Sequence, residues 1–201
     1  MIRASYTPGS CEVADRYHRF YFAQQQWNEK LIIAGVTNDV CTVYPALSLV
    51  RDGVRIHGLR QFSSLAFFMA YGLGMLRPDV SILDSSRQVV ADALAQMEAG
   101  DVLVVASCFP YTPSVLVTAE VAARRGIEVI ALTDSASSPL AKTAVHSFYV
   151  PNHSLFFSNS MCEFILLAYG LLSTVASALG EAAVEALKYR EALISELNSS
   201  I

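Results

Sequence analysis

The stretch DVLVVASCFPYTPSVLV, residues 101–117, is the part of the sequence that decides the fold. It begins as a run of aliphatic and β-branched residues, which is typical of a buried strand. The run then breaks at Ser107 into a polar segment rich in proline and turns apolar again, with Pro113 suited to an early helical position. This pattern predicts a strand that ends in a polar loop and is followed by a helix.

The same alternation extends from residue 54 to residue 150. Five short aliphatic runs predict strands: VRIHGL, DVSIL, DVLVVAS, IEVIALT and VHSFYV. Three stretches with helical spacing of Leu, Ala and Val predict helices between them: SSLAFFMAYGLGML, RQVVADALAQMEAG and PSVLVTAEVAARRG. Two of these helices end at Gly100 and Gly126, where a residue with positive φ can close the last turn. Since strands joined by crossover helices run parallel, the sequence predicts an α/β fold, a three-layer α/β/α sandwich.

After residue 150 the chain predicts two helices, an apolar one from about Ser158 and an amphipathic one through EAAVEALKYREALISELN. The uncharged run at residues 164–180 falls just short of the roughly 20 apolar residues that span a bilayer, and it contains Ser, Thr and Gly. We therefore interpret it as a buried or interface helix rather than a membrane anchor. Because it is apolar on nearly every face, we expect a second copy to cover part of it in a symmetric homodimer.

Composition narrows the classes of function. The 201 residues are 53% hydrophobic and carry a net charge of −4, which fits one compact domain. The 14 Lys and Arg residues are scattered, whereas a nucleic-acid-binding surface needs clustered basic side chains. The four cysteines stand far apart without a CxxC pair, so we expect no metal or other cofactor and a reduced, cytoplasmic chain. The charged, proline-containing N-terminus predicts no signal peptide.

Polar residues gather on the loops that follow two of the predicted strands. In an open parallel sheet, ligands bind beyond the carboxyl ends of the strands, where the strand order reverses. Hydroxyl groups and free N–H groups at helix N-termini favour a phosphate there, although Ser and Thr at such positions most often only cap the helix. Two such loops facing one crevice favour a phosphate ester, which an Arg side chain can hold through two hydrogen bonds. The candidate ligand-binding residues are Arg60, Ser63 and Ser64 on the first loop and Ser107, Tyr111, Thr112 and Ser114 on the second.

Residues 58–80, GLRQFSSLAFFMAYGLGMLRPDV, and residues 101–141, which end in TDSASSPLA, resemble the sugar isomerase (SIS) domain. The form they resemble is the effector module of RpiR-type transcription regulators, over about residues 54–197. The resemblance implies a five-stranded parallel sheet in the flavodoxin-like order, with phosphosugars or amino-sugar phosphates bound by the loops after the first and third strands. Ser107 and Thr112 match the family's phosphate loop. Because such effector modules bind sugar phosphates without converting them, we favour a sensing module over an aldose–ketose isomerase.

An isomerase would need a base that moves a proton between adjacent carbons. The candidates are His153, in the polar segment PNHSLFFSNS, and Glu163, the one charged residue between residues 152 and 180. His153 is more typical of a solvated residue or a helix cap. Glu163 is consistent with a base, an interface partner or a helix-start residue. We therefore assign neither of them a catalytic role.

The upstream segment LIIAGVTNDVCTVYPALSLVRDG, residues 31–53, resembles isochorismatase-like and nicotinamidase-like cysteine hydrolases. The resemblance implies Cys41 as the nucleophile, on a strand-to-helix turn whose N–H groups stabilise a thiolate. The catalytic Asp and Lys of that family have no matching context in residues 1–30, so we interpret Cys41 as an inert, buried thiol. A cysteine hydrolase remains the third function class.

We divide the chain into an N-terminal segment of uncertain fold, residues 1–53, and a phosphosugar-binding domain, residues 54–201. Within the first part, LIIAGV predicts a strand and residues 41–50 predict a helix. No helix-turn-helix pattern precedes the domain. We therefore expect a regulatory role to require another chain.

Overall fold

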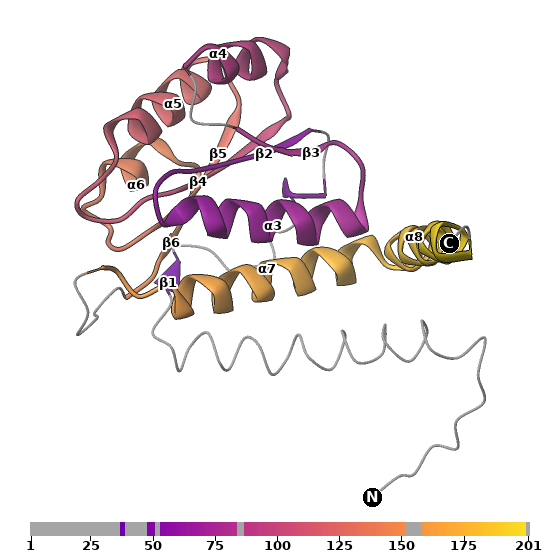
Figure 1. The fold of residues 1–201 in the computed structure, drawn as a ribbon. Coiled ribbons are helices and arrows are strands. Elements are labelled where there is room, and N and C mark those ends of the chain that lie inside the picture. Colours follow the sequence, from indigo (N-terminus) through magenta and orange to yellow (C-terminus); the bar gives the residue numbers. More distant parts are fainter. Residues whose placement is uncertain (1–36, 39–47, 51–52, 84–86, 152–157, 200–201) are drawn as a thin grey trace, which may run out of the picture.

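The computed structural model describes residues 37–38, 48–50, 53–83, 87–151 and 158–199. Within these residues lie six strands and six helices, labelled as in Figure 1. The strands are β1 (Thr37–Asn38), β2 (Val54–Gly58), β3 (Val80–Ile82), β4 (Val102–Ala106), β5 (Glu128–Thr133) and β6 (His146–Tyr149). The helices are α3 (Phe62–Leu76), α4 (Arg87–Gln96), α5 (Pro113–Arg124), α6 (Pro139–Thr143), α7 (Cys162–Leu179) and α8 (Glu181–Ser199).

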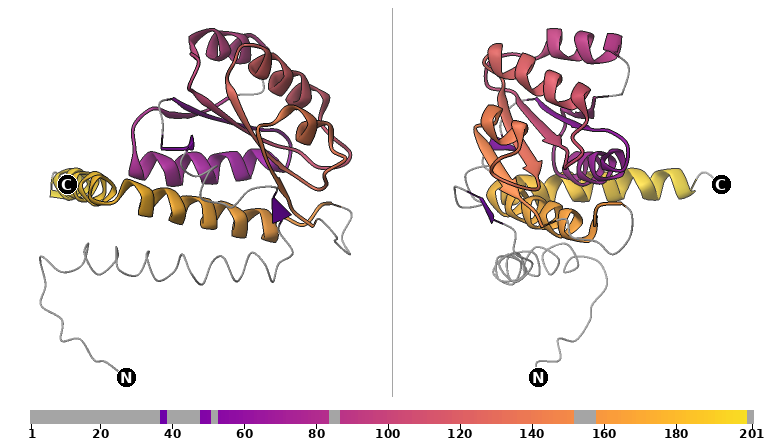
Figure 2. Two further views of the ribbon diagram at one scale, coloured as in Figure 1. Left: turned by 180° about the vertical axis from the view of Figure 1, so that it is seen from behind. Right: turned by 90° about the vertical axis from the view of Figure 1, so that its left-hand side faces the viewer.

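The strands form one sheet in the order β1-β6-β5-β4-β2-β3. The five strands from β2 onward are parallel, so the predicted five-stranded sheet in the flavodoxin-like order is confirmed. The short strand β1, which follows the segment LIIAGV in the sequence, pairs antiparallel with β6 and adds an edge strand to the sheet. Helices cover both faces, with α3 and α7 on one side and α4, α5 and α6 on the other (Figure 1). Helix α8 continues from α7 and extends beyond the sheet (Figure 2).

The core lies in two layers, one on each face of the sheet. Strand β4 is buried along its whole length, as expected for the central strand of a parallel sheet. Its alternate residues point to opposite faces. Val104 and Ala106 join the layer beneath α3 and α7, whereas Leu103 and Val105 join the layer beneath α5.

Two turns depend on glycine. A Cβ atom on Gly58 would lie 2.5 Å from the carbonyl oxygen of Phe62, so a glycine here lets α3 start directly against the end of β2. Gly126 has a φ of +78°, and the N–H of Ile127 donates to the carbonyl of Ala122 at 3.1 Å across the end of α5. Gly100 also has a positive φ, +110°. The expected glycine turn at the end of α5 is therefore confirmed, whereas α4 ends before Gly100 and the expected helix end at that glycine is wrong.

Helix α7 is long and apolar enough to cross a membrane by length and composition alone. Half of that window is buried inside the fold, however. The ring of Phe164 meets the ring of Phe62 edge to face, with their centroids 5.0 Å apart, so α7 packs closely on α3. The expectation of a buried helix is confirmed for this face.

Two helices differ from the sequence-based expectations, and some expected elements lie outside the described residues. Helix α6 was not predicted, although the Ser138 side chain accepts a hydrogen bond from the N–H of Leu140 and Pro139 follows it, which is a common helix start. Helix α4 ends at Gln96, four residues before Gly100. The expected strand LIIAGV and most of the expected helix at residues 41–50, including Cys41, lie outside the described residues, as does His153.

Candidate functional site

The two polar loops start side by side at the carboxyl edge of the sheet. Strands β2 and β4 are parallel neighbours, with Gly58 opposite Ala106 at their ends. The chain leads from β2 outward to β3 and from β4 outward to β5, so the strand order reverses between them. This is where a parallel sheet opens a crevice for a ligand. The neighbouring position of these two loops, expected from the family resemblance, is confirmed.

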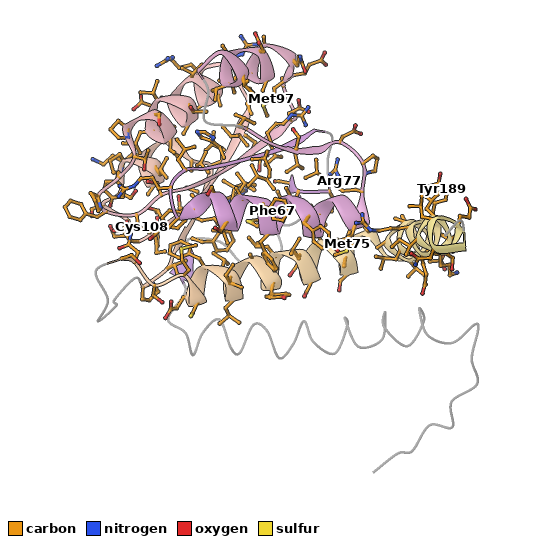
Figure 3. All side chains as sticks on the ribbon, in the orientation of Figure 1. Phe67, Met75, Arg77, Met97, Cys108 and Tyr189 are labelled. Carbon is orange, nitrogen blue, oxygen red and sulfur yellow. The ribbon has the colours of Figure 1, made fainter. Side chains whose placement is uncertain are left out.

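A cavity of about 310 Å³ lies between these loops. Three of the predicted site residues line it, namely Arg60, Ser107 and Thr112. Gln61, Ser158 and Asn159 contribute further polar groups, and the sequence analysis did not identify them. Figure 3 labels Cys108, another lining residue, in the loop that leaves β4.

Ser107 is held firmly at the base of this cavity, where it is 1% exposed. Its Oγ accepts a hydrogen bond from the N–H of Thr112 at 3.1 Å, and its carbonyl accepts one from the Thr133 hydroxyl at 2.8 Å. Since the Oγ atom accepts the Thr112 bond, the Ser107 hydroxyl proton is left to donate to a ligand. Pro113 has no N–H group, so side chains carry more of the donor capacity here than at an ordinary helix N-terminus.

Arg60 and Gln61 form the opposite wall. Arg60 has a φ of +58°, a left-handed conformation that costs free energy in a residue other than glycine. The Nε2 atom of Gln61 is buried and has no hydrogen-bond partner among the described residues. An unpaired buried amide of this kind calls for a partner that a ligand can supply. Gln61 lies in the same polar loop as Arg60, and this position could have identified it as a site residue from the sequence.

Tyr111 faces away from this cavity. Its hydroxyl donates to Asp134 Oδ1 at 2.9 Å, and the N–H of Phe109 donates to Asp134 Oδ2 at 3.3 Å. Burial first, and then the hydrogen bond to Asp134, raises the pKa of Tyr111, so the phenol keeps its proton as the donor. Asp134, directly after β5, thus ties down the loop that follows β4.

The three remaining predicted serines lie outside the cavity lining. Ser63 and Ser64 are exposed on the first turn of α3, and the Ser63 hydroxyl donates to the Arg60 carbonyl at 2.7 Å. Ser114 is exposed on the first turn of α5 and lines a different cavity. A ligand role for these serines and for Tyr111 stays a prediction.

The segment before α7 lines the crevice from a distant part of the sequence. The Asn159 side chain donates to the Phe109 carbonyl at 3.3 Å, which ties the segment before α7 to the loop after β4. The Ser160 hydroxyl donates to the carboxylate of Glu163, three residues further along the chain. Glu163 therefore has the contact of a helix-start residue, one of the three interpretations left open. No group of three or more His, Cys, Asp or Glu side chains suited to a metal ion occurs in the described part of the chain.

These features define a doubly wound α/β domain with a small polar crevice at its switch point. The family model of the SIS domain matches residues 54–177, so the chain belongs to the SIS domain family. No curated protein matches the sequence. The match begins after the segment that resembles cysteine hydrolases, so the family assignment lends that segment no support.

Solved structures share the fold. The sugar isomerase domain of an RpiR transcription factor from Sphaerobacter thermophilus aligns with a TM-score of 0.73 at 22% identity, over 86% of this chain and 96% of that one. The Vibrio vulnificus NanR protein, solved with ManNAc-6P, aligns with a TM-score of 0.67 at 16% identity, over 95% of this chain and 70% of that one. A Methanococcus jannaschii protein with an inferred 3-hexulose-6-phosphate isomerase function aligns at 0.56 and 16% identity, over 89% of this chain and 94% of that one.

Proposed function

We propose that the crevice between the loops after β2 and β4 binds a sugar phosphate or an amino-sugar phosphate, as a sensing module. One observation carries the proposal. The described polar residues that line the cavity offer a cation, three hydroxyl groups and two amides, and none of them is acidic. A phosphate presents only acceptors at its anionic oxygens, so the Arg60 guanidinium and the Ser107 hydroxyl complement it.

Three features support binding of an anion at this place. The cavity lies at the switch point, and the left-handed conformation of Arg60 occurs where a ligand would be held. Gln61, whose buried amide nitrogen has no partner among the described residues, also lines the cavity. The NanR relative was solved with a phosphorylated sugar, which makes this class of ligand the first to test.

We propose that the domain binds the sugar phosphate without isomerising it. Proton transfer between adjacent carbons needs a base within hydrogen-bond reach of the substrate. Among the described lining residues there is no carboxylate and no imidazole, and Glu163 already accepts a hydrogen bond from Ser160. The test of this part is solvent deuterium exchange at C2 of fructose 6-phosphate and glucosamine 6-phosphate. We expect none, and exchange that depends on the protein would identify an isomerase instead.

Thermal shift and calorimetry test the binding itself. We expect hexose and amino-sugar phosphates, with ManNAc-6P among them, to raise the melting temperature, while the free sugars do not. Arg60→Gln and the double variant Ser107→Ala, Thr112→Ala should weaken binding at least tenfold, because each removes hydrogen bonds to a charged group. Absence of any shift up to millimolar phosphate ester would refute the proposal.

Matched controls come from the predicted residues that lie away from the cavity. If the ligand contacts only the cavity lining, Ser63→Ala and Ser64→Ala should leave the affinity within about twofold, and the predicted ligand role of these two serines would then be wrong. Loss of binding in these variants, with retention in the Arg60 and Ser107 variants, would place the ligand elsewhere.

A further inference from the structure

A second cavity, of about 580 Å³, lies on the other face of the sheet between α4 and α5. Its walls are mainly aliphatic, with Val90 and Leu94 from α4 and Val117 and Val121 from α5. Val117 is 57% exposed, so the cavity opens to solvent. A small apolar molecule fits a space of this size and lining.

The floor of this α4–α5 cavity holds one polar group that the fold leaves unpaired. His57, on β2, lines the cavity and is 1% exposed. Its Nδ1 lies 3.2 Å from the carbonyl oxygen of Leu83, and its Nε2 is buried without a hydrogen-bond partner among the described residues. By contrast, the Thr118 hydroxyl of the same lining already donates to the Ser114 carbonyl at 2.8 Å. A buried polar atom without a partner is unfavourable. A ligand whose donor reaches Nε2, after the side chains that cover this atom have moved aside, removes that cost.

The hydrogen bond at Nδ1 determines what His57 can offer a ligand. A carbonyl oxygen only accepts, so Nδ1 carries the proton of the ring. Burial lowers the pKa of His57, which keeps the imidazole neutral and leaves a lone pair on Nε2. The ligand must therefore bring the donor.

A charged ligand does not suit this lining. Taking a charge into aliphatic walls is costly unless it is paired, and a neutral imidazole does not pair it. Arg125 is the one charged residue among the described residues of the lining, and it is exposed. The complementary molecule is uncharged, apolar over most of its surface and equipped with one hydroxyl group.

We propose that the α4–α5 cavity is a second ligand site, separate from the phosphosugar crevice, for an uncharged apolar alcohol or phenol whose hydroxyl donates to His57 Nε2. The site does not depend on the proposed sugar-phosphate function, because His57, its recognition group, lies beneath α4 and α5 and not in the crevice lining. Leu59 is the described residue common to the two linings.

The test uses two probes of nearly the same shape, 2-naphthol and 2-methoxynaphthalene, of which only the first can donate a hydrogen bond. In titrations of the full chain followed by protein NMR, we expect saturable binding of 2-naphthol at one site. We expect roughly tenfold weaker binding of the methyl ether, as for the loss of one hydrogen bond.

Variants locate the site. Ala95→Trp places a large side chain in the cavity from an exposed helical position and should abolish binding of 2-naphthol. Ala182→Trp, at an exposed position on α8, is the matched control and should bind normally. His57→Phe should bind both probes with similar affinity. If His57→Phe fails to fold, Ala95→Trp still tests the location of the site.

Three outcomes of the titrations would overturn the proposal. They are no saturable binding of 2-naphthol up to its solubility limit, equal affinity for the two probes, and full binding by Ala95→Trp. A fourth is dissociation of an oligomer by Ala95→Trp, seen in sedimentation, because a second copy would then occupy the cavity instead.

Discussion

Arg60 combines backbone strain with the one positive charge among the described residues of the crevice lining. Glycine adopts a φ of +58° without the Cβ clash. We therefore expect Arg60→Gly to raise the unfolding free energy by up to about 1 kcal/mol while it weakens sugar-phosphate binding at least tenfold. Urea denaturation and calorimetry measure the two effects.

Asp79 provides the control, since it has a φ of +63° and lies outside the crevice lining. Asp79→Gly should leave affinity unchanged. Equal loss of affinity in both variants would contradict the role of the Arg60 charge.

His57 makes the stability of the fold depend on pH. Its ordinary pKa is 6.5, and burial lowers the pKa in the folded state. Well above pH 6.5 the ring is neutral whether the chain is folded or unfolded, so it contributes no pH dependence. As the pH falls below 6.5, the unfolded chain binds a proton that the folded chain resists, so stability is lost.

The expected loss is up to about 1.4 kcal/mol per pH unit below that point, continuing until the lowered pKa is reached. Urea denaturation of the wild-type protein and of His57→Gln at pH 7.5 and pH 5.0 isolates this contribution as the difference between them. An identical pH dependence in both proteins would show that His57 accepts its proton in the folded state as readily as in the unfolded one.

At the scale of an element, the start of α3 depends on Gly58. An added Cβ would lie 2.5 Å from the Phe62 carbonyl oxygen, and a backbone atom cannot rotate away. We expect Gly58→Ala to cost about 1–3 kcal/mol of stability and to weaken sugar-phosphate binding, because the loop with Arg60 must shift.

Gly74→Ala, within α3 itself, is the matched control, because nothing lies within 4 Å of an added Cβ there. It should stabilise the protein by about 0.5–1 kcal/mol and leave binding unchanged. Urea denaturation distinguishes them, and equal effects would contradict the packing argument.

At the scale of the whole molecule, α8 presents an apolar stripe beyond the fold. Tyr189, Leu193 and Leu197 recur every four residues and are 70%, 40% and 72% exposed. Figure 3 labels Tyr189 on this helix, away from the sheet. The expected homodimer stays a prediction, and this stripe extends the proposed interface from α7 to α8.

We expect the double variant Leu193→Glu, Leu197→Glu to raise the dimer dissociation constant at least tenfold, since burying each Leu contributes about 1.5–3 kcal/mol. Sedimentation velocity measures it, with Ser195→Glu as the control on another face of α8. A stable wild-type monomer at micromolar concentration would refute the dimer.

The sequence by itself determined the order and the type of the main elements. Strand and helix periodicities differ, and a crossover helix between two strands makes them parallel, so local patterns from residue 54 onward were enough for the layered fold. The same patterns placed polar residues after the strands that end at Gly58 and Ala106.

Only the tertiary structure decided which of those residues face the crevice. Tyr111 turns to Asp134, which is 23 residues away in the sequence, whereas Gln61 lines the cavity. From the sequence, His57 is indistinguishable from the other residues of a buried strand. The structure shows that a cavity between α4 and α5 lies beside it. The direction of a side chain in a loop, and the space next to a strand, depend on contacts between distant segments, which no local periodicity records.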